Sequence, residues 1–137
     1  MDSPATIVDS NVLLDVVTED ATWGAWSSEA LAKAADRGVL VINPVIYAEV
    51  STRFTRIEDL DDALHPRDFR RDALPWDAAF LAAKAFSAYR NRGGRRETTL
   101  PDFFVGAHAA VEGFTLLTRD AKRYRTYFPT VSLMTPS

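Results

Sequence analysis

The chain contains no cysteine, only two histidines and no apolar run long enough to cross a membrane. Without cysteine it has no disulfides, thiolate metal sites or thiol nucleophile. No glycine-rich turn follows a strand-like run, which excludes a P-loop NTPase and a dinucleotide oxidoreductase, and no Gly-x-Ser-x-Gly elbow indicates a serine hydrolase. The first residues lack the basic and apolar segments of a signal peptide. We therefore expect a cytoplasmic protein without membrane association.

The length and the composition are those of one globular domain, which we expect to span residues 1–137. The chain is 47% apolar and 26% charged, so it can bury a continuous core. Its net charge of −3 argues mildly against non-specific nucleic-acid binding. A divalent cation held by clustered carboxylates would instead attract a polyanion, so the net charge alone does not indicate whether the protein binds nucleic acid.

Strand-like apolar runs alternate with helical patterns along the chain, which predicts a parallel sheet with crossover helices. We expect a three-layer α/β/α sandwich around a central parallel sheet of four to five strands. The expected strands are 5–9, 39–42, 114–118 and 131–134. The expected helices are 11–17, 23–37, 44–55, 76–91, 101–112 and 120–127, with a weaker helical segment at 57–70. For helix 76–91 we expect an inner face that contains Phe80, Ala83, the stem of Lys84, and Ser87.

Four acidic residues are placed where this fold brings them to one end of the sheet. Asp9 and Asp120 follow expected strands, Asp102 begins a helix, and Glu49 lies in the helix that leaves the second strand. Ligand sites of open α/β sheets form outside the carboxyl ends of the strands. Carboxylates gathered there without histidine or cysteine suit Mg²⁺, with Mn²⁺ as a substitute. We predict that all four are metal ligands and catalytic residues.

Each acid also has a purely structural explanation. Asp9 and Asp120 can cap the helices that follow them, Glu49 can pair with Arg53, and Thr99 with Asp102 fits a capping box. Taken together, however, carboxylates about 4 Å apart repel by about 1 kcal/mol per pair in water and by more when partly buried. A cluster of this kind therefore favours a bound cation.

Polar residues beside the acids are candidates for supporting roles. Ser10 and Asn11 can orient the Asp9 carboxylate or hold a metal-bound water, although Asn11 also fits a simple turn. The histidines, His65 and His108, have no metal-ligand partners in the sequence, and we expect His108 to be a packing or surface residue.

Four segments carry a resemblance to a known family: 7–11 (IVDSN), 48–50 (AEV), 100–109 (LPDFFVGAHA) and 116–120 (LLTRD). Together they resemble the PIN-domain nucleases, and more narrowly the VapC toxins of bacterial type II toxin–antitoxin pairs. The likeness covers essentially the whole chain. The residues that match the family's acidic positions are Asp9, Glu49, Asp102 and Asp120, and those that match its polar positions are Asn11 and Thr118.

The resemblance implies a Mg²⁺-dependent endoribonuclease, usually a homodimer, that is inhibited by a small VapB-like antitoxin whose tail enters the catalytic groove. We expect an in-line water to hydrolyse an RNA phosphodiester bond. One metal would be held chiefly by Asp9 and Asp102, and a second, if present, would lie nearer Asp120. Glu49 would complete the coordination or position the water. The alternatives are a PIN-domain RNA-processing nuclease without an antitoxin, and a non-catalytic module whose acidic pocket holds a metal or a partner's arginine.

Two further surfaces are predicted. Candidate RNA contacts, which would make binding depend on salt, are Arg95, Arg96, Lys122 and Arg123. Their alternative is a solvated surface. Candidate apolar anchors for an antitoxin are Ile57, Leu60, Leu64 and Phe69, whose alternative is packing within their own domain.

Overall fold

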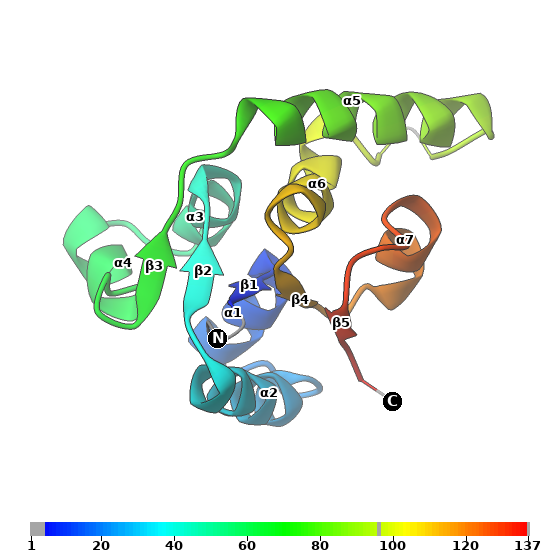
Figure 1. Cartoon of the computed structure of the whole chain (residues 1–137). Coiled ribbons are helices and arrows are strands. Elements are labelled where there is room, and N and C mark those ends of the chain that lie inside the picture. The colour runs from blue at the N-terminus through cyan, green and yellow to red at the C-terminus, as the bar shows by residue number, and fades with distance from the viewer. Residues whose placement is uncertain (1–4, 96, 137) are drawn as a thin grey trace.

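The computed structural model of the chain describes residues 5–95 and 97–136, and its centre is a parallel five-stranded sheet (Figure 1). The strands are β1 (Thr6–Val8), β2 (Leu40–Ile42), β3 (Phe69–Arg71), β4 (Thr115–Leu117) and β5 (Leu133–Met134). Their order across the sheet is β3-β2-β1-β4-β5, and every neighbouring pair is parallel. The predicted α/β fold with four to five parallel strands is confirmed.

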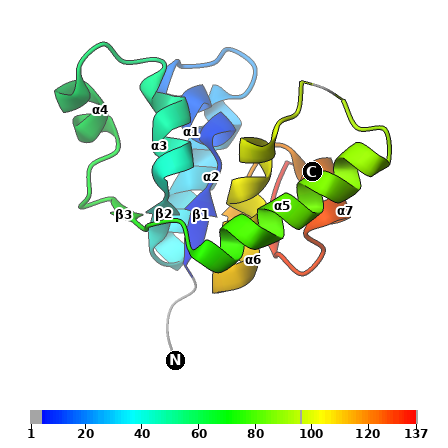
Figure 2. The same ribbon diagram turned by 90° about the horizontal axis from the view of Figure 1, so that it is seen from above.

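Helices cover both faces of the sheet. They are α1 (Ser10–Val17), α2 (Gly24–Arg37), α3 (Pro44–Ser51), α4 (Ile57–Ala63), α5 (Trp76–Asn91), the 3₁₀ helix η1 (Leu100–Phe103), α6 (Phe104–Glu112) and α7 (Ala121–Tyr127). Figure 1 shows α2 on one side of the sheet and α5 with α6 on the other. Figure 2 shows α1 and α3, which follow β1 and β2, on the same end of the sheet, and these two helices are in contact. The described residues contain no helix that is long and apolar enough to cross a membrane.

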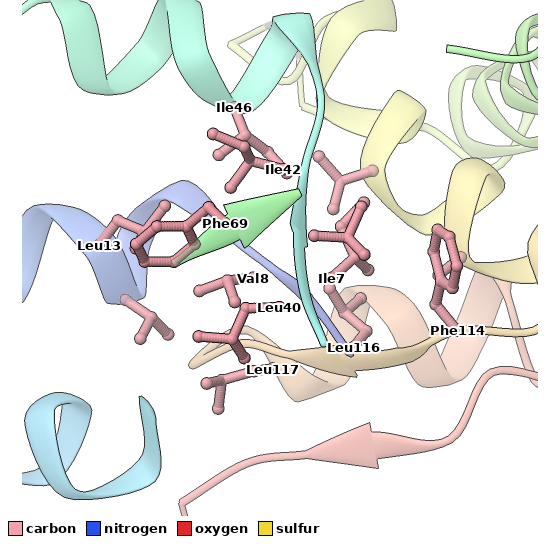
Figure 3. Close-up of a cluster of buried hydrophobic side chains, with 14 of the residues drawn as sticks. Ile7, Val8, Leu13, Leu40, Ile42, Ile46, Phe69, Phe114, Leu116 and Leu117 are labelled. Atoms are coloured by element: carbon pink, nitrogen blue, oxygen red, sulfur yellow. The ribbon is translucent and has the colours of Figure 1, made fainter. Parts of the chain in front are cut away.

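The core lies between these layers and includes the three central strands (Figure 3). Ile7, Val41 and Leu116 are fully buried, one in each of β1, β2 and β4. A parallel strand covered on both faces reads as a continuous apolar run rather than an alternating one. This is why the short runs in the sequence predicted these three strands correctly.

The segment 57–70 differs from its prediction as a single weak helix. Helix α4 ends at Ala63, and Phe69 begins the edge strand β3, which pairs with Leu40 of β2. Pro66 lies between the two elements, where it would remove a backbone donor from a continuous helix. Only Phe69 of this strand is buried, so the strand has little apolar signal in the sequence.

The inner face predicted for α5 is wrong. Phe80 is 66% exposed, and Lys84 and Ser87 are exposed as well. The buried residues of this helix are Ala78, Ala82 and Ala85. These small residues recur at helical spacing and let α5 pack closely against α6, so the expectation that the large aromatic ring points inward fails.

The strand order reverses between β1 and β4. From β1 the chain adds β2 and then β3 on one side, whereas β4 and β5 lie on the other side. Where the strand order reverses in this way, ligands bind outside the carboxyl ends of the strands. Asp9 and Thr118 are the residues that directly follow β1 and β4 at this point.

Candidate active site

Asp9 lies at the centre of the site. The register pairs Val8 with Leu117, so the next residue of each strand, Asp9 and Thr118, also lie side by side. The Thr118 hydroxyl donates a hydrogen bond of 2.8 Å to Asp9 Oδ2, and the Tyr124 hydroxyl donates another of 3.0 Å to the same oxygen. The Asp9 side chain makes no capping hydrogen bond to α1, so the helix-cap explanation is not observed.

Asp9 is a buried carboxyl without a countercharge. Its exposure is 7%, and among residues 5–95 and 97–136 no lysine or arginine forms an ion pair with it. Burial raises the pKa of Asp9 above its usual range, the hydrogen bonds from Thr118 and Tyr124 oppose the rise, and the nearby Asp120 adds to it. A cation at this position would therefore remove an electrostatic cost.

Glu49 reaches the same site from α3. The Ser10 hydroxyl donates a hydrogen bond of 3.1 Å to Glu49 Oε1, which joins the start of α1 to α3. Glu49 lies at the exposed rim, where partial desolvation raises its pKa and the charges of Asp9 and Asp102 raise it further. No ion pair between Glu49 and Arg53 occurs in the described part of the chain.

Asp102 lies in η1, and Asp120 lies in the turn between β4 and α7. The backbone N–H of Thr99 donates a hydrogen bond of 2.6 Å to Asp102 Oδ2, so the capping box predicted for this residue is present. Asp120 makes no capping hydrogen bond to α7, and its carboxylate lies 3.5 Å from Arg123 Nε. Helix capping therefore explains the position of one oxygen of Asp102, but it does not explain the position of Asp120.

Asn11 connects the two strand ends. Its Nδ2 atom lies 3.4 Å from both Asp9 Oδ2 and Thr118 Oγ1, and its Oδ1 accepts a hydrogen bond of 3.3 Å from the backbone N–H of Arg119. The Thr118 hydroxyl oxygen accepts a hydrogen bond of 3.0 Å from the backbone N–H of Asp120. The predicted supporting residues Ser10, Asn11 and Thr118 thus contact the acids.

The donor set fits a hard divalent cation in its chemistry. Within the described residues, no three acidic or histidine side chains lie close enough together to hold a metal ion as they stand. Mg²⁺, however, usually keeps several waters and takes only one or two carboxylates together with substrate phosphates. The side-chain hydrogen bonds to Asp9 all reach Oδ2, and those from Thr99 reach Oδ2 of Asp102. Asp9 also interacts with the backbone N–H of Ser10, and none of these side-chain hydrogen bonds reaches Oδ1 of Asp9 or of Asp102.

A buried ion pair beside the site was missed by the sequence reasoning. Arg119 donates from Nε and Nη2 to the two oxygens of Asp15, at 2.6 and 3.0 Å, and the Ser27 hydroxyl donates to Asp15 at 2.7 Å. The guanidinium also lies over the ring of Trp23, 5.1 Å from its centroid. The sequence contains one signal for this ion pair: Asp15 is a charged residue within the apolar run 12–17, and a charge in such a run indicates a buried partner. Tyr124 had no such signal.

Of the predicted RNA contacts that the structure describes, Arg123 is the one that pairs with an acid of the site. Arg123 approaches Asp120, as described above, while Lys122 is exposed on the same helix. Arg95 is exposed in the loop after α5, where its backbone N–H donates to the Tyr89 hydroxyl. Arg96 lies outside the described residues. The structure does not test RNA binding by any of the four.

His108 is a packing residue, as one of its two predicted explanations required. It is 1% exposed, its Nδ1 lies 3.1 Å from Asn43 Nδ2, and its ring packs against Phe114. Asn43 in turn accepts a hydrogen bond of 2.9 Å from the backbone N–H of Ile46, which caps α3, the helix of Glu49.

The chain was compared with known proteins. Its backbone is similar to VapBC2 of Rickettsia felis, in a complex with promoter DNA (TM-score 0.72, 15% identity, 96% of this chain and 98% of that chain). It is also similar to VapBC-1 of nontypeable Haemophilus influenzae (TM-score 0.71, 14% identity, 96% and 97%) and to a toxin–antitoxin complex of Klebsiella pneumoniae (TM-score 0.70, 20% identity, 96% and 98%). Among curated proteins, none matches the sequence. The PIN domain model matches residues 6–129, so the chain belongs to the PIN domain family, whose nucleases are hydrolases that act on nucleic acids.

Proposed function

We propose that the chain is a metal-dependent endoribonuclease and the toxin of a VapBC-type toxin–antitoxin pair, active in the cytoplasm. Membership of the PIN family supports the nuclease, and the similarity to VapBC complexes supports the toxin. The observation that carries the proposal is the buried carboxyl of Asp9 at the reversal of the strand order, which has no ion-pair partner among the described residues. The charges of Asp120 and Glu49 act on it, and that of Asp102 acts on Glu49.

The proposed metal ligands are Asp9, Glu49, Asp102 and Asp120. A bound Mg²⁺, or Mn²⁺ in its place, would neutralise their charge and lower the pKa of a bound water. Asp9 and Asp102 would be its chief ligands, while Asp120 would lie nearer the leaving oxygen. Glu49 at the rim would orient the attacking water through its second oxygen.

Hydrolysis then needs only positioned oxygen atoms from the protein. The water gives up a proton to solvent as its oxygen forms a bond to phosphorus, and the bond from phosphorus to the leaving ribose oxygen breaks as that oxygen takes up a proton from solvent. Thr118 and Asn11 would keep Asp9 in its orientation through their hydrogen bonds. Ser10 would do the same for Glu49. No histidine is required as a base, and His108 is buried away from solvent.

Cleavage of RNA by purified protein tests this function. Wild type should cut RNA with Mg²⁺ and should lose activity in excess EDTA. Asp9→Asn, which removes a ligand charge at nearly constant shape, should lower the rate by orders of magnitude. The matched control is Asp36→Asn, which changes an exposed carboxyl at the end of α2. Full activity of Asp9→Asn, or of wild type in EDTA, would refute the mechanism.

The proposed partner is a small VapB-like antitoxin. Of the four predicted apolar anchors, Leu60, Leu64 and Phe69 are buried in the chain's own core, and only Ile57 is exposed, at 62%. Ile57 lies at the rim of a hollow of about 190 Å³ between α3 and α4 that Phe54 also lines. An apolar side chain of the antitoxin would fill this hollow, and its arginine would reach the acids from there.

Co-expression with the antitoxin-like reading frame expected upstream tests the partner. A stable complex should form, and its ribonuclease activity should be low. Ile57→Asp should weaken that complex, whereas Val111→Asp should not, because Val111 is similarly placed on a helix surface but lies on α6. A complex that keeps undiminished ribonuclease activity would exclude the inhibitory role.

The RNA path remains a proposal that rests on four cations, Arg95, Arg96, Lys122 and Arg123. Each phosphate contact that is lost should reduce the dependence of RNA affinity on salt. Arg95→Ala combined with Lys122→Ala should therefore flatten the plot of log affinity against log salt. An unchanged slope would remove these residues from the path.

A further inference from the structure

We propose that Tyr124 is a positioning residue for the proposed metal site: its hydroxyl, together with that of Thr118, holds Oδ2 of Asp9 so that Oδ1 faces the cation. The inference rests on the proposed function, because it assigns a role in metal binding. Tyr124 comes from α7, and Asp9 follows β1, so two segments that are 115 residues apart meet at one oxygen atom.

The contact is made by a well-defined donor in a buried place. Tyr124 is 2% exposed, and its hydroxyl lies 3.0 Å from Asp9 Oδ2. A phenol is protonated at neutral pH and a carboxylate oxygen can only accept, so Tyr124 is the donor in this hydrogen bond. A tyrosine whose only purpose is packing needs no hydrogen-bond partner at a carboxylate, and phenylalanine would fill the same space.

The ring of Tyr124 has little freedom to move. Gly106 of α6 packs against it so closely that a Cβ atom there would lie 2.9 Å from Tyr124 Cδ1 and closer still to the ring of Phe128. Phe128 packs on Tyr124 with ring centroids 6.3 Å apart. The same helix, α6, directly continues η1, which carries Asp102. One helix therefore positions a proposed ligand and also fixes the tyrosine that orients another.

The hydroxyls of Thr118 and Tyr124 both help to orient the Asp9 carboxylate. Thr118 approaches Oδ2 from β4, and Tyr124 approaches it from α7. Without Tyr124, the remaining side-chain donors to this oxygen are Thr118, at 2.8 Å, and Asn11, at the longer distance of 3.4 Å, so the carboxylate has more freedom to rotate about its last torsion. Partners of this kind typically change metal affinity or activity by about 10-fold to 100-fold when they are removed.

The test compares Tyr124→Phe with Tyr127→Phe. Both variants remove one phenol oxygen from α7, but the Tyr127 side chain points to the aromatic rings of Tyr89 and Phe103 and not to an acid. Mn²⁺ binding to the RNA-free protein is measured by titration calorimetry, and cleavage is measured as a function of Mn²⁺ concentration. We expect Tyr124→Phe to weaken Mn²⁺ binding by about 10-fold. Cleavage by this variant should recover at saturating Mn²⁺, whereas Tyr127→Phe should match wild type in both measurements.

The possible results distinguish the positioning role of Tyr124 from the proposed metal-dependent nuclease function. Equal Mn²⁺ affinity of wild type and Tyr124→Phe overturns the positioning role while leaving the nuclease intact. Absence of Mn²⁺ binding by wild type overturns the proposed metal site and this role with it. Gly106→Ala supplies a second variant, because the added methyl group would clash with the rings of both Phe128 and Tyr124, more closely with Phe128, and the packing around Tyr124 must shift. It should weaken Mn²⁺ binding as Tyr124→Phe does, and unchanged Mn²⁺ affinity of a folded Gly106→Ala protein would also count against the role.

Discussion

The ion pair between Arg119 and Asp15 should contribute measurably to stability, unlike the surface pairs of this protein. The Asp15 side chain is only 6% exposed, and that of Arg119 is 27% exposed. Arg119→Met keeps most of the length of the side chain, but among the described residues it leaves Asp15 with the Ser27 hydroxyl as its one remaining side-chain partner. Removing one partner of a buried pair typically costs about 3–5 kcal/mol, and the partial exposure of Arg119 favours the lower end.

This magnitude converts into a shift of the melting temperature. For 137 residues, an unfolding entropy of about 2.1 cal/mol/K per residue gives about 0.29 kcal/mol/K in total. A loss of about 3 kcal/mol should therefore lower Tm by about 10 °C. Thermal unfolding followed by circular dichroism in EDTA measures the shift without a contribution from a metal.

Two further variants show whether the cause is the orphaned charge. Lys33→Met is the control, because it breaks the exposed pair of Lys33 with Glu29, whose side chains are 67% and 70% exposed, and should cost less than about 0.5 kcal/mol. Asp15→Leu combined with Arg119→Met should be less destabilised than Arg119→Met alone, since no unpaired charge remains. If Arg119→Met unfolds within about 2 °C of Lys33→Met, the pair is not a stabilising element and the reasoning is wrong.

Three other predictions follow from single residues. Burial lowers the pKa of His108, so the folded state binds fewer protons than the unfolded state, and stability should fall as the pH decreases below about 6.5; a chemical-denaturation series should lose this pH dependence in His108→Gln. Asp9→Asn should be more stable than wild type in EDTA at neutral pH, and Mg²⁺ should raise the Tm of wild type alone; an equal response of both proteins would contradict the proposed metal site. Trp76 and Phe80 are 92% and 66% exposed on α5, so we propose that this face contributes to the expected homodimer; light scattering should find Trp76→Ser with Phe80→Ser monomeric if it does.

The sheet was largely predictable because its central strands are buried on both faces. Their apolar runs and the helical periods between them predicted the order of elements and the α/β class, which the structure confirms. The edge strand β3 was missed because only Phe69 of its three residues is buried. Helix α5 was predicted at its observed bounds, but its buried face was predicted wrongly. That face is determined by packing against α6, and the local sequence of α5 contains no information about this contact.

The acids themselves were predictable as candidates, because each has a position relative to a strand or a helix start. Their partners were not. Tyr124 reaches Asp9 across 115 positions, and Arg119 reaches Asp15 across 104. Contacts over such separations depend on the register between β1 and β4 and on the angle at which α7 leaves the sheet. A single sequence contains no signal for either of these.

Stability and the proposed chemistry oppose each other at the strand ends. Burying Asp9 without a countercharge among the described residues is unfavourable, and Asp120 nearby makes it more so. The ion pair of Arg119 with Asp15 offsets part of this energetic cost at the same turn, because Arg119 lies between Thr118 and Asp120 in the chain. Its guanidinium binds an acid outside the proposed metal site and leaves Asp9 without a cation. An arginine that reached Asp9 instead would stabilise the folded protein more directly, and it would occupy the position that a divalent cation needs.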